Sequence, residues 1–220
     1  MPTALVIGAS RGLGRALAQE LHGRGWQVIA TVRDPAALSP EPGLDVVTLD
    51  VTDWAGVDAL PAKLGQARID LLFVNAGIAP DPAAPIGTVD PAIFAQAMLT
   101  NAYAPLRLIE RLEPLTRADA TVAVMSSGLG SIANNTTGSW EAYRMTKAAL
   151  NTGLKSLEAR DTGSRTWLAV APGWVRTDMG GAGAPLSIEQ SIPALVDMLE
   201  ARRETGGATF VDYRNSVVAW

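Results

Sequence analysis

Seven short apolar runs, separated by longer stretches of helical periodicity, constrain the fold of this chain more than any other feature. We expect strands at 3–7, 27–32, 45–49, 70–74, 121–125, 166–171 and 208–213, and helices at 12–23, 54–65, 91–113, 141–159 and 187–203. Runs such as 70–74 are apolar throughout, which indicates a sheet that is covered on both faces. Strands that alternate with helices at this spacing predict a doubly wound parallel sheet.

No internal repeat, charge run or low-complexity tract interrupts this alternation. The Pro- and Gly-rich stretches at 35–43, 80–87 and 180–185 are too short for interdomain linkers, and we expect them to be surface loops. With 48% hydrophobic and 18% charged residues, the composition is that of a globular protein and not of a disordered chain. We therefore predict one α/β domain over residues 1–220, with a Rossmann-type sheet of about seven strands between helices on both faces.

The charge and the reactive side chains exclude several classes of function. The net charge of −4 leaves no basic surplus for binding nucleic acid or anionic lipid. Cysteine is absent and His22 is the only histidine, so disulfides, thiolate zinc sites and a cysteine nucleophile are excluded. A Ser-His-Asp triad and a histidine metal site are also disfavoured, and we expect no metal. The apolar start at 4–7 is too short for a signal sequence or a membrane span, so a cytoplasmic protein is the default expectation.

The first expected strand leads directly into a glycine-rich turn, Gly8-Ala9-Ser10-Arg11-Gly12-Leu13-Gly14, which a helix follows at once. A bound phosphate needs backbone N–H groups at a helix N-terminus, with glycines where side chains would block its approach. The spacing G-x-x-x-G-x-G is related to the dinucleotide-binding fingerprint. Many strand-to-helix turns are rich in glycine, but the position after the first strand favours dinucleotide binding. No Gly-Lys-Ser/Thr occurs, which excludes a P-loop.

The residues after the second strand favour NADP over NAD. An NAD site usually has an acidic residue there to bind the ribose hydroxyls, whereas a 2′-phosphate requires arginine. Val32 occupies the place of the acid, Arg33 follows it, and Arg11 lies in the glycine turn. Two arginines at one corner fit a phosphate dianion. The alternative is that both arginines are solvated surface charges, and Asp34 complicates the pattern.

Tyr143 and Lys147 are four residues apart in the helical stretch 141–159, for which Ser139 is the expected N-terminal cap. This spacing places the phenol and the ammonium group on one helix face. A tyrosine of ordinary pKa, about 10, is a poor acid or base at neutral pH. A neighbouring cation favours the phenolate and so lowers that pKa. Taken alone, the pair is frequent by chance and is better explained as an amphipathic surface pair.

Small and hydroxylated residues follow four of the expected strands. They are the glycine turn, Asn75-Ala76-Gly77, Ser126-Ser127 and Pro172-Gly173-Trp174-Val175-Arg176-Thr177. The carboxyl ends of parallel strands meet at one edge of a sheet, where such folds bind their ligands. The sequence therefore predicts a crevice for a cofactor and a substrate at this edge.

Together with Asp50-Val51 and Asn101, these motifs resemble those of the short-chain dehydrogenase/reductase family over essentially the whole chain. The segments 126–132, 143–151 and 173–179 are further similar to the carbonyl-reductase-like branch that includes C-factor and sniffer. The resemblance implies that Tyr143 donates and accepts the proton and that Lys147 binds the nicotinamide ribose and lowers the tyrosine pKa. It also implies that Ser127 binds the substrate oxygen and that Asn101 holds a water linked to Lys147. The coenzyme-binding residues that it implies are Gly8, Ser10, Arg11, Gly12, Leu13, Gly14, Arg33, Asp50, Val51, Asn75, Ala76, Gly77, Tyr143, Lys147, Pro172, Gly173, Val175 and Thr177.

Two features depart from the family pattern or leave it open. Ile7 and Val74 replace a threonine and an asparagine that are common in the family. Ser127 precedes Tyr143 by sixteen positions, slightly more than usual, so Ser126 remains an alternative for the carbonyl-binding hydroxyl. The family places its substrate lid at 178–189, which is short and glycine-rich here.

The leading expectation is an NADP-dependent oxidoreductase that acts on a small ketone, aldehyde or alcohol. A non-catalytic NADP(H)-binding sensor of the same fold is the alternative from another class, although a sensor would not require Ser127, Tyr143, Lys147 and Asn101 together. An epimerase or dehydratase of the extended branch would need a longer C-terminal domain. Relatives commonly pair through the helices equivalent to 91–113 and 141–159, so we expect a homodimer, with monomer and tetramer left open.

Overall fold

The computed structural model covers residues 1–220, and its strands and helices alternate along the chain. The strands are β1 (Thr3–Ile7), β2 (Gln27–Val32), β3 (Leu44–Thr48), β4 (Ile69–Val74), β5 (Thr116–Met125), β6 (Thr166–Ala171) and β7 (Gly207–Asp212). The helices are α1 (Gly12–Gly23), α2 (Trp54–Leu64), α3 (Pro91–Met98), α4 (Ala104–Leu112), α5 (Glu141–Glu158) and α6 (Ile188–Ala201). All seven strands are parallel in one sheet, in the order β3-β2-β1-β4-β5-β6-β7. The predicted fold class is confirmed.

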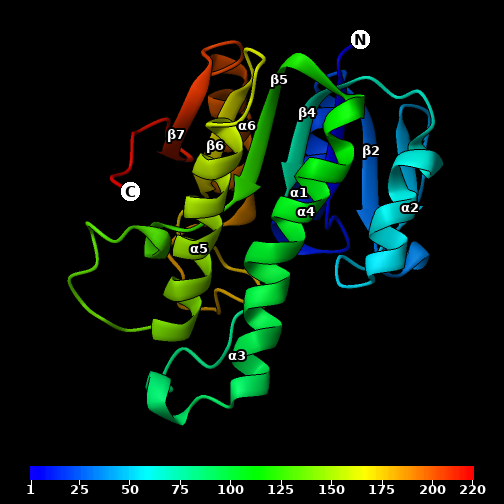
Figure 1. Cartoon of the computed structure of the whole chain (residues 1–220). Coiled ribbons are helices and arrows are strands. Elements are labelled where there is room, and N and C mark those ends of the chain that lie inside the picture. Colours follow the sequence, from blue (N-terminus) through cyan, green and yellow to red (C-terminus); the bar gives the residue numbers. More distant parts are fainter.

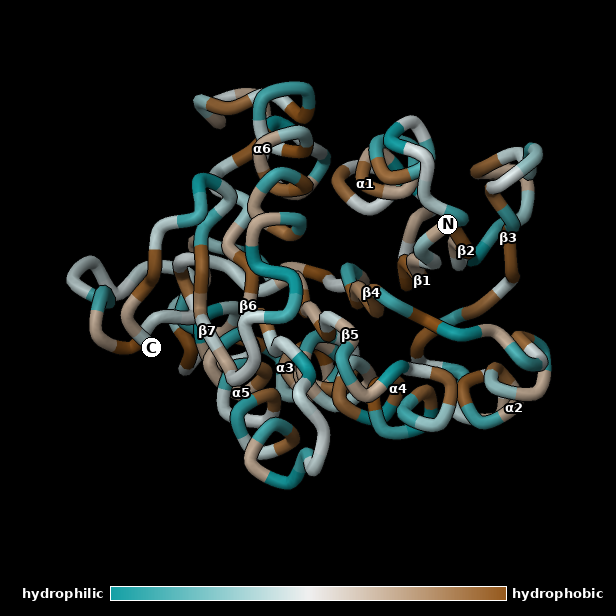
Figure 2. Tube along the Cα trace, turned by 90° about the horizontal axis from the view of Figure 1, so that it is seen from above, coloured by the Kyte–Doolittle hydropathy of each residue, from teal (hydrophilic) through white to brown (hydrophobic).

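The sheet is buried on both faces, as its continuous apolar strands predicted. Helices α1 and α6 cover one face, and α2, α4 and α5 cover the other (Figure 2). Each face has its own apolar core, with Phe73 fully buried in one and Phe210 in the other. Burial of this apolar area is the main force that holds the layers together. None of the helices has both the length and the apolar character that a bilayer span requires.

The order of the strands places the ends of the central strands side by side. In the sheet, Val74 pairs with Ile7 on one side and with Val124 on the other. Strands β1 to β3 are added toward one edge of the sheet, and β4 to β7 toward the other. The reversal of strand order lies between β1 and β4, and doubly wound sheets bind ligands at such a point. The loops after these strands meet at the edge where α3 projects from the molecule (Figure 1).

Two predicted elements differ from those observed. Strand β5 begins at Thr116 and not at 121, because a register irregularity opposite Ile69–Leu71 lets charged residues at 117–119 interrupt the apolar run. The single helix expected at 91–113 is α3 followed by a π-helical turn, η3 (Leu99–Tyr103), and then α4. The other predicted bounds agree with the structure within two residues.

Candidate active site

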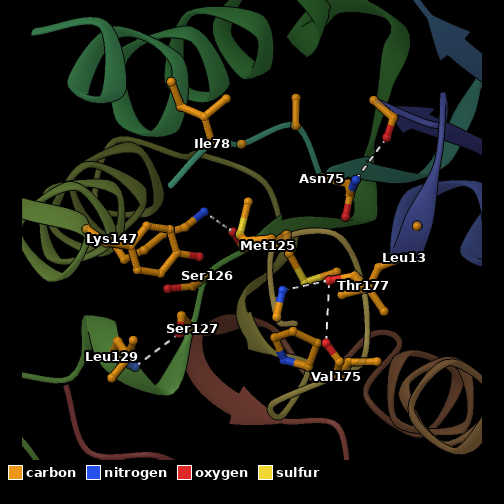
Figure 3. A pocket seen from close by; sticks show the side chains of 18 of the residues that line it. Leu13, Asn75, Ile78, Met125, Ser126, Ser127, Leu129, Lys147, Val175 and Thr177 are labelled. Carbon is orange, nitrogen blue, oxygen red and sulfur yellow. Dashed lines mark hydrogen bonds between the residues drawn. The ribbon is translucent and has the colours of Figure 1, made fainter. Parts of the chain in front are cut away.

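A cavity of about 910 Å³ opens at the carboxyl edge of the sheet. This volume is near the upper end of the roughly 300–1,000 Å³ that is usual for small-molecule sites. Residues that follow β1, β4, β5 and β6 line it (Figure 3). Every predicted site residue lines this cavity except Gly14 and Asn101. The structure thus brings together the four strand ends that the sequence pointed to.

Close contacts in the glycine turn leave no room for a side chain at Gly8 or Gly14. Gly8 has a φ of 89°, and a Cβ there would lie 2.9 Å from the Cα of Ala76. A Cβ on Gly14 would lie 2.2 Å from the carbonyl oxygen of Gly8. Gly14 is therefore needed for packing of α1 against β1 and does not line the cavity. The side-chain amide of Asn75 donates a 2.9 Å hydrogen bond to the Gly8 oxygen and ties the two strand ends together.

Helix α1 begins at Gly12 with no side-chain cap from Arg11. The N–H groups of its first turn therefore lack a side-chain partner, and they carry the positive end of the helix dipole. Gly12 and Leu13 of this turn line the cavity. This geometry fits the phosphate groups of a dinucleotide.

Arg33 and Asp34 have different environments at the far end of the cavity. Arg33 lines the cavity, and its backbone N–H donates a 3.0 Å hydrogen bond to the hydroxyl of Ser10. Asp34 does not line it, because its carboxylate accepts a 2.9 Å hydrogen bond from the backbone of Ala36. Val32 is buried in the apolar core and also lies outside the cavity lining. Arg33 is thus the cation directly after β2 that a ligand in the cavity could contact.

Asp50 and Arg11 complete this end of the cavity. The Asp50 carboxylate accepts hydrogen bonds from the backbone N–H and the hydroxyl of Thr52, and these bonds lower its pKa. The positive charge of Arg33 lowers the pKa of Asp50 further, so the group stays ionised. Arg11 forms an ion pair with Asp178, which belongs to the loop after β6. This pair was not predicted from the sequence.

Tyr143 and Lys147 are buried on the face of α5 that meets the end of β5. The Lys147 ammonium donates a 2.8 Å hydrogen bond to the carbonyl oxygen of Met125 and lies 5.6 Å from the centre of the Tyr143 ring. Burial lowers the pKa of Lys147 to about 8. Burial raises the pKa of Tyr143 above its ordinary value, and a hydrogen bond with Ser127 opposes that rise. The phenol is therefore protonated at neutral pH.

The two adjacent serines after β5 form different hydrogen bonds (Figure 3). Ser126 is buried, and its hydroxyl donates a 2.7 Å hydrogen bond to the side-chain oxygen of Asn151. Ser127 is half-buried, and its hydroxyl oxygen accepts a 3.2 Å hydrogen bond from the backbone of Leu129. The contact with Tyr143 places the Ser127 hydroxyl beside the phenol, where a ligand oxygen could meet both groups.

Asn101 lies in the π-helical turn η3 and is fully buried. Its side chain donates to the carbonyl oxygen of Ile78 at 2.7 Å and accepts from the N–H of Ile78 at 2.8 Å. It also donates to the hydroxyl of Thr146 on α5. Asn101 therefore connects the loop after β4 to the helix that carries Tyr143 and Lys147.

The segment 178–189, predicted as a lid, is loop only as far as Ser187. The N-terminus of α6 follows at Ile188, where Ser187 and Gln190 form a capping box. Leu186 pairs with Trp174 and Arg176 through backbone hydrogen bonds of 3.2 and 2.9 Å. These bonds close the segment between them into a loop, and Asp178, Met179 and Gly180 line the cavity.

Several residues of the cavity wall were not predicted from the sequence, chiefly Trp140, Arg144 and Tyr213. Trp140 occupies the N-cap position of α5, so the expectation that Ser139 caps this helix is wrong. The signal that could have found Trp140 is its position three residues before Tyr143, one helical turn away. Trp174 also lines the cavity, and its indole N–H donates a 2.8 Å hydrogen bond to the carbonyl oxygen of Gly180.

Comparison with known proteins adds three kinds of similarity. A family model described as enoyl-(acyl carrier protein) reductase matches residues 8–204. A Burkholderia multivorans protein assigned to the short-chain dehydrogenases/reductases, solved with bound NADP, is 44% identical, with a TM-score of 0.96 over 100% of this chain and 99% of that one. The carbonyl reductase Sniffer of D. melanogaster is 30% identical, with a TM-score of 0.88 over 100% of both chains. C-signal of Myxococcus xanthus is 38% identical over 166 residues, which are 74% of this chain and 99% of that protein.

Proposed function

The chain belongs to the short-chain dehydrogenase/reductase family, and on that premise we propose that it transfers hydride between NADP(H) and a small carbonyl or alcohol substrate. The observation that carries the proposal is the grouping of Tyr143, Lys147 and Ser127 in one cavity with the glycine turn. A substrate oxygen in reach of both the phenol and the serine hydroxyl would receive a proton from one and a hydrogen bond from the other.

NADP(H) is the coenzyme that the cavity fits best. The first turn of α1 has no side-chain cap, and a side chain at Gly8 or Gly14 would clash with neighbouring residues. A glycine turn of this kind, at a helix N-terminus, suits a pyrophosphate. Arg33 supplies a cation where NADP has its 2′-phosphate, and the Asp34 carboxylate is turned away to the backbone of Ala36. The Burkholderia relative, at 44% identity, holds NADP. NAD lacks the phosphate that Arg33 would bind.

When bound, the coenzyme supplies or accepts the hydride; the remaining chemistry belongs to this chain. In reduction, the Tyr143 phenol gives its proton to the carbonyl oxygen as negative charge develops there. The Ser127 hydroxyl stabilises the same oxygen by a hydrogen bond. Lys147, held by the Met125 oxygen, places a positive charge beside the phenol and favours the phenolate that remains. In the reverse direction, that phenolate takes the proton of an alcohol.

Three further parts of the proposal concern the whole chain. Residues 1–220 act as one coenzyme-binding domain, and the loop within 178–189 covers the substrate. Asn101 acts through a water molecule that connects Lys147 to solvent; the Asn101 oxygen and the Lys147 ammonium both lie beside Gly77. Two copies of the chain associate through the helical segment from α3 to α4 and through α5.

A second candidate is a non-catalytic sensor that binds NADP(H) and signals through a partner. The similarity to C-signal, a protein whose name describes signalling, favours it. A sensor would need the glycine turn and Arg33 but no proton donor. Retention of Tyr143, Lys147 and Ser127 in the cavity wall therefore supports the enzyme over the sensor.

The test is oxidation of NADPH by the purified protein, followed at 340 nm, with aldehydes, ketones, diketones and quinones. Binding of NADPH is measured separately by calorimetry. We expect NADPH to bind and at least one class of carbonyl to be reduced faster than in the absence of protein. Binding without reduction of any class would support the sensor and contradict the enzyme.

A further inference from the structure

Trp140 has a backbone conformation that bulky residues rarely adopt. Its φ is 64° and its ψ is 33°, in the left-handed region. Only two other residues besides glycines have a positive φ, Glu204 and Asn215, and neither lines the cavity. Strain of this kind persists where the surroundings hold it, and it gathers at functional sites.

Arg144 holds the strained segment in place. Its Nε donates a 2.6 Å hydrogen bond to the carbonyl oxygen of Ser139, directly before Trp140. Its two terminal nitrogens donate to the hydroxyl of Thr137 at 3.1 Å and to the carbonyl oxygen of Leu129 at 3.4 Å. One guanidinium group therefore connects α5 to Leu129, just before the loop 131–139, and to Thr137 and Ser139 at the far end of that loop, whose residues 132–139 are exposed.

Arg144 is an unusual residue for such a contact. Only 9% of it is exposed, and no carboxylate lies within ion-pair distance of it. Its polar partners are neutral oxygens of the loop 131–139 and of Leu129 just before it. The planar fork of arginine can reach three such acceptors at fixed angles, which a lysine cannot do.

The strained conformation places the indole of Trp140 beside the reactive phenol. The rings of Trp140 and Tyr143 meet edge to face, with their centres 5.8 Å apart and their planes at 65°. Both rings line the cavity, and Trp174 lines it from the loop after β6. A substrate whose oxygen reaches the phenol therefore lies next to the Trp140 indole.

We propose that Trp140 determines substrate preference and that Arg144 is the positioning residue that holds it there. The Trp140 indole favours a carbonyl compound with a flat, unsaturated ring over one with a saturated ring of the same size, because aromatic rings gain from edge and face contacts with it. This inference rests on the proposed function and deepens it. Arg144 acts through the loop and not as a charge that binds the substrate.

Acetophenone and cyclohexyl methyl ketone test the role of Trp140, since they differ only in the ring. We expect Trp140→Ala and Trp140→Gly to lower the preference for acetophenone, measured as the ratio of the two kcat/KM values, by about 2- to 12-fold. The loss should arise mainly in KM. Glycine tolerates a positive φ, so Trp140→Gly should melt at a higher temperature than Trp140→Ala with the same loss of preference. Trp54→Ala, a half-buried tryptophan outside the cavity, is the control.

The role of Arg144 is tested with Arg144→Lys and Arg144→Gln. Both variants lose the three-way fork, so both should lose the preference for acetophenone to the same extent while NADPH binding stays within about twofold. Amide hydrogen exchange in 131–139 should be faster in Arg144→Lys than in wild type, and unchanged in Arg160→Lys, which alters a surface arginine paired with Glu110. This exchange needs no turnover and also detects a variant that has unfolded.

The outcomes separate this inference from the proposed function. If wild type reduces no carbonyl compound at all, the proposed function is wrong. If wild type reduces both ketones and the Trp140 variants keep the same ratio of kcat/KM, only the role of Trp140 is overturned. If Arg144→Lys keeps the preference and the exchange rates of wild type while Arg144→Gln loses both, the charge matters and the positioning role is overturned.

Discussion

The Lys147 ammonium lies 5.6 Å from the ring centre of Tyr143 and is held there by the carbonyl oxygen of Met125. Burial acts on the two groups in opposite senses: it lowers the pKa of the lysine and raises that of the tyrosine. The buried lysine still carries most of its charge at neutral pH, because its pKa is about 8. Its charge is therefore available beside the phenol when a phenolate must form.

Burial of Lys147 has a measurable effect on stability. The folded-state pKa of about 8 is below the ordinary 10.5, so the unfolded chain binds more protons between these two values. The free energy of unfolding should therefore rise with pH in this window. Relative to Lys147→Met, which cannot titrate, wild type should gain about 2 kcal/mol between pH 7 and pH 9.5.

Urea denaturation of both proteins at several pH values, without coenzyme, measures this difference. Tyr143 keeps its proton over this range because its pKa is raised, and its titration in the unfolded chain is common to both proteins. A difference between the two proteins that stays constant from pH 7 to pH 9.5 would show that Lys147 titrates normally in the folded state.

The two serines after β5 should respond differently to loss of the hydroxyl. Ser127→Ala removes the hydroxyl beside Tyr143, and we expect kcat to fall about 10²- to 10³-fold. Ser126→Ala leaves the side-chain oxygen of Asn151 without its donor, and we expect roughly 1–3 kcal/mol lower stability with less than tenfold change in kcat. Steady-state kinetics and thermal melts of both variants measure these effects. A large loss of kcat in Ser126→Ala, with little loss in Ser127→Ala, would assign the carbonyl-binding hydroxyl to Ser126.

Arg33→Ala should weaken the use of NADPH selectively. A hydrogen bond to a charged group contributes about 1.5–3 kcal/mol, so kcat/KM for NADPH should fall roughly 10- to 150-fold while that for NADH changes far less. Arg11→Ala should have a smaller effect, because Arg11 already pairs with Asp178. The measurement uses one carbonyl substrate with each coenzyme. An equal loss for both coenzymes, or a wild type that prefers NADH, would contradict the role of Arg33.

The homodimer is expected from the apolar side chains on α5 and on the turn before α4. Leu99, Tyr103 and Met145 are each 40–48% exposed, and a second copy would cover them. Sedimentation equilibrium at micromolar concentration should give about twice the chain mass of 23.0 kDa. A single species of 23 kDa would rule out the dimer at that concentration.

Most of the sheet was predictable because a parallel strand buried on both faces is an uninterrupted apolar run. The exception was the start of β5, where Arg117 and Asp119 are charged and a register irregularity lies opposite. The π-helical turn around Asn101 was not predictable, since an added residue in one helical turn leaves the apolar pattern almost unchanged.

The motif residues of the cavity were predictable from the strand ends, but its substrate wall was not. Trp140 reaches the cavity through a left-handed backbone, for which tryptophan gives no sequence signal, and Arg144 reaches it through hydrogen bonds to a loop. The pairing of Arg11 with Asp178 depends on how two distant loops fold toward each other. Such contacts depend on tertiary geometry and not on local pattern.

The most direct test of the proposed chemistry is the rate of NADPH oxidation by Tyr143→Phe with a carbonyl substrate of the wild type, with NADPH binding measured on the same preparation. Phenylalanine keeps the ring that contacts Trp140 and Lys147 and removes only the hydroxyl that carries the transferred proton. We predict that turnover falls at least ~10²-fold while NADPH binds as in wild type. Turnover close to that of wild type would contradict the assignment of Tyr143 as the proton donor.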